Sequence, residues 1–325
     1  MEVSLWLWLA VIGFIVVALL FDLFVLHRDA HEVTMREAGW TSAVWIAFGL
    51  CFGVIVWVLF GADRAGEYFA GYLIEKSLSV DNIFVFALIF SYFAVPSIYQ
   101  HRLLFWGVLG ALVFRAIFIA AGAALLENFH WMIYVFGAFL VLTGIKMGVY
   151  RGHAADPGKN PVLRLLRRLM PMTDTYEGQR FFIRRAGRLV ATPLLAVLVA
   201  IETTDIIFAV DSIPAIFAIT SEPFLVFTSN AFAILGLRAL YFLLAGMIRR
   251  FAYLKLGLAV VLVFVGVKML LTDVYKVPVW TSLGIIAAIL GLAVGVSWRN
   301  SDGDDNEPRS DHADDRSRAE VESPM

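Results

Sequence analysis

Apolar runs of about 20 residues follow one another along most of the chain, and an α-helix of that length crosses roughly 30 Å of hydrocarbon. Nine such runs can be placed, near residues 4–26, 40–61, 67–93, 101–125, 129–150, 191–219, 224–247, 253–273 and 278–298. The pattern predicts an all-α, polytopic membrane protein with about nine transmembrane helices in a domain at 1–298. Residues 299–325 mix acids, serines and arginines without apolar periodicity, so we expect a disordered cytoplasmic tail.

Composition agrees with a membrane protein. Of the 325 residues, 60% are hydrophobic and only 16% are charged, which is too apolar for a soluble domain of this size. The single cysteine, Cys51, can form no disulfide within the chain and does not indicate a compartment. The first run follows no basic segment and has no small-residue cleavage site, so we expect a true span instead of a signal peptide. The lipid bilayer is the expected partner, no nucleic acid is expected, and no protein partner is identified.

Basic residues in the loops predict the orientation. The segment 151–190 is the richest in arginine and lysine, which places it in the cytoplasm. Counting spans outward from it, the N-terminus lies outside and the C-terminus inside. Within this segment, residues 161–170 alternate leucines and arginines in the pattern of a basic amphipathic helix. We expect that helix to lie on the inner leaflet, with docking of a partner as the alternative.

Three carboxylates interrupt the apolar run at 191–219, namely Glu202, Asp205 and Asp211. A charge near the bilayer centre costs from roughly 2.5 to more than 10 kcal/mol, so such residues face a protein interior, a partner or water. Pro214 removes a backbone donor from the same run. We therefore expect a kink or break beside Asp211 that lets the acids converge on a cation, as in the discontinuous helices of transporters.

A second polar group interrupts the run at 67–93. Helical spacing places Glu75 and Asn82 on one face and Asp81 on the neighbouring face. A ligand set made only of oxygen suits hard cations such as Mg²⁺, Ca²⁺ or Mn²⁺ and disfavours zinc and copper. The predicted metal ligands are Asp22, Glu75, Asp81, Asn82, Glu202, Asp205, Asp211 and Ser212.

Basic residues inside the apolar runs nearly balance these acids. They are Lys76, Arg115, Lys146, Arg238 and Lys268. One interpretation is that they only neutralise buried acids, and we favour it for Arg115 and Arg238. The other is that Lys146 or Lys268 occupies the place of the cation when the site is empty, so that release is coupled to rearrangement.

The charged positions also reveal an internal repeat. The matching pairs are Ser79–Ile83 with Ala209–Ile213, Phe114–Ala116 with Leu237–Ala239, and Gly144–Met147 with Gly266–Met269. Residues 67–150 are thus repeated at 191–273. Because each unit contains three spans, the second copy is inverted relative to the first, as in many secondary transporters. The pairing of the acids stays open, since Asp81 matches either Asp211 or Asp205.

These motifs resemble those of the TerC family of integral membrane proteins, in its branch of Alx-type manganese exporters. The resemblance covers about 1–300 and is found at Asp22–Leu23 before His27–Arg28, at Glu75–Asn82, at Glu202–Asp205 and at Val210–Ala215. It implies efflux of Mn²⁺ across the inner membrane of a bacterium. It also implies a fold similar to the LysE transporter superfamily and an association with tellurite resistance. Manganese comes from this resemblance alone.

The sequence therefore predicts a secondary transporter that exports a divalent cation, Mn²⁺ ahead of Ca²⁺ or Mg²⁺, through a midplane carboxylate site. Proton exchange is a plausible driving force, and no resident cofactor is expected. The alternative is a non-transporting membrane scaffold of a metal or tellurite stress response, which recruits partners through the basic segment and the tail. An enzyme is not expected, because no histidine or cysteine nucleophile arrangement accompanies the acids.

Overall fold

The protein is described by a computed structural model. It describes residues 3–21, 34–149, 160–185, 187–244, 253–275 and 277–304. Asp22 and most of the predicted tail lie outside the described residues, so the expectations for them stay predictions. The described part of each predicted apolar run is helical.

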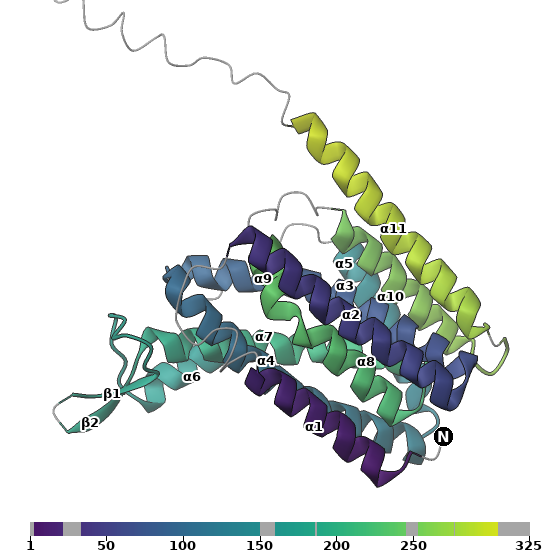
Figure 1. Cartoon of the computed structure of the whole chain (residues 1–325), viewed down its shortest axis with the longest axis horizontal. Coiled ribbons are helices and arrows are strands. Elements are labelled where there is room, and N and C mark those ends of the chain that lie inside the picture. Colours follow the sequence, from purple (N-terminus) through teal and green to yellow (C-terminus); the bar gives the residue numbers. More distant parts are fainter. Residues whose placement is uncertain are drawn as a thin grey trace, which may run out of the picture.

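Helices make up most of the described chain (Figure 1). Their bounds are α1 Leu5–Phe21, α2 Met35–Phe60, α3 Ala62–Tyr92, α4 Ser97–Asn128, α5 Met132–Val149, α6 Pro161–Leu169, α7 Pro193–Phe217, α8 Pro223–Leu235, α9 Leu237–Leu244, α10 Leu254–Leu270 and α11 Val279–Asp304. The only strands among the described residues form an antiparallel hairpin, β1 Phe182–Arg185 and β2 Arg188–Ala191. Helix α11 continues into the segment that we expected to be a disordered tail.

Five described helices, α2, α4, α5, α7 and α11, are long and apolar enough to cross a membrane, and the count is six if the bent pair α8–α9 is one span. Helices α1 and α10 have 17 residues each, and α3 has charged residues within its apolar sequence. Nine spans therefore remain a prediction, whereas a predominantly helical fold with several candidate spans is observed.

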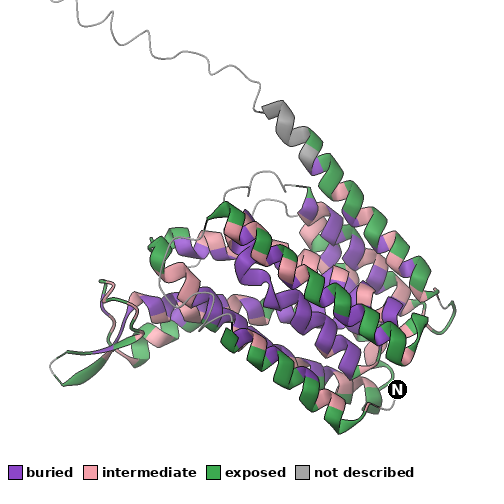
Figure 2. Ribbon diagram, viewed as in Figure 1, coloured by how far each residue is buried: buried purple, intermediate pink, exposed green. Residues whose placement is uncertain are grey.

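The outer helices expose large apolar side chains and the central ones bury them. In Figure 2, buried residues gather on α7, α8 and the inner faces around them, whereas α1, α2 and α11 are largely exposed outward. Trp6 is 81% exposed, Val58 79% and Leu292 70%. Continuous apolar surface of this kind is unusual in a soluble monomer and marks a surface that faces lipid.

The break that we expected beside Pro214 is not found. Helix α7 is unbroken through Pro214 to Phe217. Because Pro214 lies in the last turn, the backbone hydrogen bond that it removes affects only the helix end. The break lies instead between α8 and α9, which meet at Gly236 with a bend of 42°. There the Nζ of Lys76 donates a hydrogen bond to the carbonyl oxygen of Ala233 at 3.1 Å, which satisfies one of the orphan carbonyls at the end of α8.

Helices α5 and α10 pack backbone against backbone through glycines. A Cβ atom on Gly266 would lie 2.7 Å from the carbonyl oxygen of Gly137, and one on Gly137 would lie 3.1 Å from that of Gly266. Farther along the pair, a Cβ on Gly144 would lie 2.8 Å from the carbonyl oxygen of Ala259. Small residues permit such close approach, which membrane helices use because lipid gives them no hydrophobic drive to associate.

Helix α6 and the hairpin form a small module at one end of the bundle, from which the hairpin projects (Figure 1). Leu163 of α6 is buried in the main core cluster. The hydroxyl of Tyr176 donates a hydrogen bond to the carbonyl oxygen of Phe93 at 2.7 Å, and Nη1 of Arg102 donates one to Oε1 of Gln179 at 3.1 Å. These contacts fasten the module to the corner between α3 and α4.

Candidate functional site

A buried ion cluster lies where α3, α4 and α7 meet. The guanidinium of Arg115, on α4, forms ion pairs with Glu75 of α3 and with Asp205 of α7, the latter at 3.3 Å from Nη2 to Oδ1. All three side chains are almost completely buried. Charges removed from water require such partners. Arg115 therefore neutralises two buried acids, which is the first of the two interpretations given for the basic residues.

Asn230 of α8 completes the cluster. Its Oδ1 accepts a hydrogen bond from Nη1 of Arg115 at 3.1 Å, and its Nδ2 donates one to Oε2 of Glu75 at 3.2 Å. The hydroxyl oxygen of Ser212 accepts from Nη1 of Arg115 at 3.2 Å. Asn230 was not among the predicted site residues. The available signal was an amide directly after Thr228 and Ser229 inside a predicted span.

Asp81 and Asp211 face a small cavity beside this cluster. The cavity has a volume of about 40 Å³. Its lining residues are Leu78, Asp81, Asn82, Arg115, Thr143, Met147, Phe208, Asp211, Ser212 and Leu262. Because a site needs about 10–15 Å³ to hold one water molecule, this cavity has room for one cation with few waters.

The polar groups around the cavity include one acceptor that no protein group satisfies. Asn82 is 2% exposed, and its Oδ1 has no hydrogen-bond partner in the described structure. The hydroxyl of Thr143 donates to Oδ1 of Asp211 at 3.4 Å. Two carboxylates, an amide oxygen and two hydroxyls therefore meet here, which is the donor chemistry of a hard divalent cation.

Glu202 does not line the cavity, and the acid whose charge acts on it is Asp205 of the ion cluster. Its carboxylate packs directly on Gly110 of α4, where a Cβ atom would collide with it, and its Oε2 is buried without a hydrogen-bond partner. Among the described residues, no three His, Cys, Asp or Glu side chains are close enough together to hold a metal ion. The predicted ligands are thus divided between the ion cluster, the cavity and Glu202, and do not form a single shell.

The predicted basic residues occupy different environments. Lys146 is exposed near the end of α5, and its charge acts on Asp211. Lys268 is half-buried, and the acid whose charge acts on it is Glu67. Arg238 is buried in α9. Of the two lysines proposed to replace the cation, Lys146 is therefore the one whose charge acts on a cavity acid within the described part of the chain.

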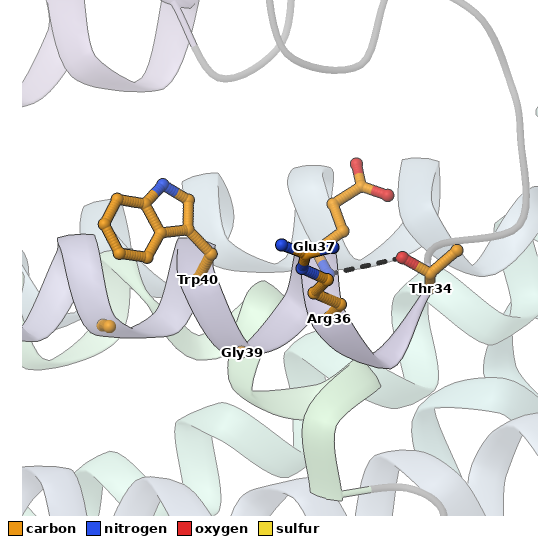
Figure 3. A pocket seen from close by; sticks show the side chains of 6 residues that line it. Thr34, Arg36, Glu37, Gly39 and Trp40 are labelled. Atoms are coloured by element: carbon orange, nitrogen blue, oxygen red, sulfur yellow. Dashed lines mark hydrogen bonds between the residues drawn. The ribbon is translucent and has the colours of Figure 1, made fainter.

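A wider hollow at the start of α2 lacks this chemistry (Figure 3). It has a volume of about 600 Å³. The residues that line it are Thr34, Arg36, Glu37, Gly39, Trp40 and Ala43. The hydroxyl of Thr34 accepts a hydrogen bond from the backbone N–H of Glu37 at 3.3 Å, so its role is to cap the helix. With one carboxylate beside an arginine, this hollow is not a candidate metal centre.

Comparison with known families supports the resemblance noted in the sequence. The sequence model of the integral membrane protein TerC family matches residues 60–304. The chain belongs to the TerC family. The matched region begins just before α3 and ends with α11, so it includes the ion cluster and the cavity. Together with the apolar helices, this membership makes the chain a multi-pass integral membrane protein.

Several relatives of this TerC family protein match over most of their length. It is 53% identical over 292 residues to an uncharacterized membrane protein of Myxococcus xanthus, covering 90% of this chain and 91% of the relative. It is 48% identical over 283 residues to the putative membrane-bound redox modulator Alx of Escherichia coli (strain K12), covering 84% and 88%. An uncharacterized membrane protein of Rickettsia bellii is 38% identical over 290 residues, covering 89% and 96%. No solved structure matches the chain.

Proposed function

We propose that this TerC family protein is a secondary transporter that exports a divalent metal cation, Mn²⁺, from the cytoplasm. The single observation behind the proposal is that Asp81 and Asp211, from two different helices, face one small cavity that also presents the unsatisfied Oδ1 of Asn82. Two carboxylates balance the charge of a divalent cation. Ionisable residues inside membrane spans are rare and mark functional sites, among them ion pathways.

The cavity favours some hard cations over others. Mg²⁺ gives up its water reluctantly and normally keeps several molecules, for which a cavity of about 40 Å³ has little room. Manganese is supported by the resemblance of the acidic motifs to those of manganese exporters. The relatives named as redox modulators suggest other chemistry. With Cys51 as the only cysteine of the sequence, however, a thiol–disulfide cycle within one chain is not available.

An inverted repeat is part of the proposal, and two features support it. Glu75 and Asp205 share Arg115, while Asp81 and Asp211 share the cavity. Asp205 follows Glu75 by the same number of residues as Asp211 follows Asp81, which favours the alignment of Asp81 with Asp211. Each predicted repeat thus contributes one acid to each pair. Sites shared in this way between two inverted repeats at the midplane are typical of alternating-access transporters.

The contact between α5 and α10 is the second feature. The repeat makes Gly144 equivalent to Gly266. Ala259 follows Gly137 by the same number of residues as Gly266 follows Gly144, so Gly137 and Ala259 are equivalent as well. The close approaches are between Gly137 and Gly266 and between Gly144 and Ala259. Equivalent positions therefore exchange partners, as they do across a two-fold axis.

The remaining parts of the proposal concern the membrane and the driving force. We infer a bacterial inner membrane from the resemblance to the Alx-type exporters. The excess of arginine in residues 151–190 places that segment in the cytoplasm, and the count of predicted spans then places the N-terminus outside and the C-terminus in the cytoplasm. Exchange against protons fits a site built on carboxylates, because acids that release a metal can take up protons.

Metal uptake into inverted membrane vesicles tests the proposal. Wild-type vesicles should take up Mn²⁺, and a pH gradient should change the rate. Asp81→Asn and Asp211→Asn should each lower uptake at least about tenfold, since even groups around a metal site cost 10–100-fold in affinity. The matched control is Asp273→Asn, an exposed carboxylate just after α10 that should leave uptake unchanged.

The same assay separates a transporter from a scaffold. One variant neutralises the arginines of residues 151–190 and lacks the tail after residue 298. A transporter with these changes that still inserts should keep most of its uptake, whereas a scaffold would lose its function. Undiminished uptake by both aspartate variants, at equal protein levels, would contradict the site.

A further inference from the structure

Met147 brings the only sulfur atom to the residues that line the cavity between Asp81 and Asp211. It lies on α5 four residues after Thr143, so the two side chains share one helical face. The hydroxyl of Thr143 donates to Asp211 at 3.4 Å. Thr143 and Met147 of α5 therefore both line the same small space, and Met147 adds a sulfur-containing residue that the oxygen-only ligand set deduced from the sequence did not include.

A thioether distinguishes classes of cation. Ca²⁺ and Mg²⁺ are hard ions that take oxygen ligands, and they gain nothing from sulfur. Mn²⁺ also prefers oxygen ligands, but as a first-row transition-metal ion it accepts a sulfur ligand more readily than Ca²⁺ or Mg²⁺ does. In a cavity with room for one cation and few waters, a thioether in the wall takes a position that a water would otherwise fill.

We propose that the thioether of Met147 is a selectivity element of the cavity, which favours divalent transition-metal cations such as Mn²⁺ over Ca²⁺ and Mg²⁺. This inference rests on the proposed function, because it assumes that the cavity binds the exported cation. It adds to that function a residue that would account for the preference for Mn²⁺ over Ca²⁺ and Mg²⁺.

The competing explanation is that Met147 only fills space, since it also packs against the apolar cluster formed by α10 and its neighbours. Leucine separates the two explanations, because a change from methionine to leucine nearly conserves volume and apolarity and removes the sulfur. The repeat supplies a matched control in Met269, which occupies the equivalent position, is 1% exposed and does not line the cavity.

The test is equilibrium binding of Mn²⁺, Ca²⁺ and Mg²⁺ to the purified full-length protein by titration calorimetry. Met147→Leu should weaken Mn²⁺ binding about tenfold, the equivalent of 1.4 kcal/mol, and leave Ca²⁺ and Mg²⁺ binding unchanged. Met269→Leu should change none of the three. X-ray absorption of Mn²⁺-loaded wild-type protein should detect a sulfur neighbour, a measurement that needs no variant and so does not depend on how Met147→Leu folds.

The outcomes are distinct. Equal weakening of Mn²⁺ and Ca²⁺ in Met147→Leu, or an absorption spectrum with oxygen neighbours only, overturns the role of the thioether. Unchanged Mn²⁺ binding in Met147→Leu together with loss of binding in Asp81→Asn overturns this inference and leaves the proposed function standing. Absence of divalent-cation binding to the wild-type protein overturns both.

Discussion

Arg115 engages two of the acids of the bundle. Its planar guanidinium reaches two carboxylates, a hydroxyl and an amide at once, which a lysine ammonium could not do in the same geometry. Glu75 and Asp205 are consequently engaged. Asp81 and Asp211 form no ion pair with Arg115, although Arg115 lines their cavity.

Removing the charge of Arg115 should be strongly destabilising. Arg115→Gln leaves two buried carboxylates without their cation, and breaking a buried pair in this way costs about 3–5 kcal/mol. Thermal unfolding in detergent should show a large fall in Tm. Arg64→Gln is the control, because the side chain of Arg64 is 34% exposed and its ion pairs are worth about 1 kcal/mol or less. Comparable losses in the two variants would contradict the central role of Arg115.

The acids of the site could be found in the sequence because a charge inside an apolar run has few structural uses. Thr143, Met147 and Asn230 could not be found in that way, because neutral side chains occur throughout membrane helices for packing. Helical periodicity also indicates the face of a residue and not the helix that covers it. The sequence therefore singled out the acids as predicted ligands, but it could not show that Arg115 engages Glu75 and Asp205 and leaves Asp81 and Asp211 at the cavity.

At the level of the helices, local sequence rules and tertiary contacts gave different answers for the two irregular positions. A proline inside an apolar run predicted a break in α7, yet Pro214 lies too close to the helix end to interrupt it. The actual break, at Gly236, lies in a run that appeared continuous. Beside it, Lys76 comes from a distant helix to satisfy the carbonyl of Ala233. Such a contact is not visible in the local sequence.

The close approach of α5 and α10 makes Gly144 intolerant of any side chain. In Gly144→Ala the new Cβ would lie 2.8 Å from a backbone oxygen of Ala259, so the helices must separate, at a cost of about 1–3 kcal/mol. Gly148→Ala, one turn farther along α5, meets nothing closer than 3.7 Å and should be neutral or slightly stabilising. Thermal unfolding of the two variants measures the difference in Tm. Equal Tm values would show that α5 and α10 can accommodate a methyl group at Gly144.

Across the whole molecule, the hydrophobic pattern predicted the helices well because burial in lipid demands long apolar runs. The hairpin was not predicted, since its two strands of four residues are too short to show a pattern. Gly187, with a φ of +77°, was the local signal for its turn. The way in which the module returns to the α3–α4 corner depends on contacts between residues distant in sequence, which one sequence does not reveal.

The hydrogen bond from Tyr176 to the carbonyl oxygen of Phe93 should hold the module in place. Burial raises the pKa of Tyr176, so the hydroxyl remains a donor. Its contribution to stability is complete below the ordinary tyrosine pKa of about 10 and is lost as the pH rises through the raised value. Tyr176→Phe should cost about 0.5–1.5 kcal/mol.

Hydrogen exchange of the module measures this effect. Amides between α6 and α7 should exchange faster in Tyr176→Phe than in the wild type, while those of α3 and α7 remain protected. Tyr275→Phe, which changes an exposed tyrosine after α10, is the control. Unchanged exchange in Tyr176→Phe would show that other contacts of the module are sufficient.

The glycine contact between α5 and α10 has the form of an interface between subunits. Under the inverted repeat that we propose, each position meets the counterpart of its own partner, so two copies of one three-helix polypeptide inserted in opposite directions would bury this same face against each other. Separate copies would have to be produced in both orientations and find one another in the bilayer. Joining the two halves in one chain fixes their ratio at one to one and makes their meeting an intramolecular event.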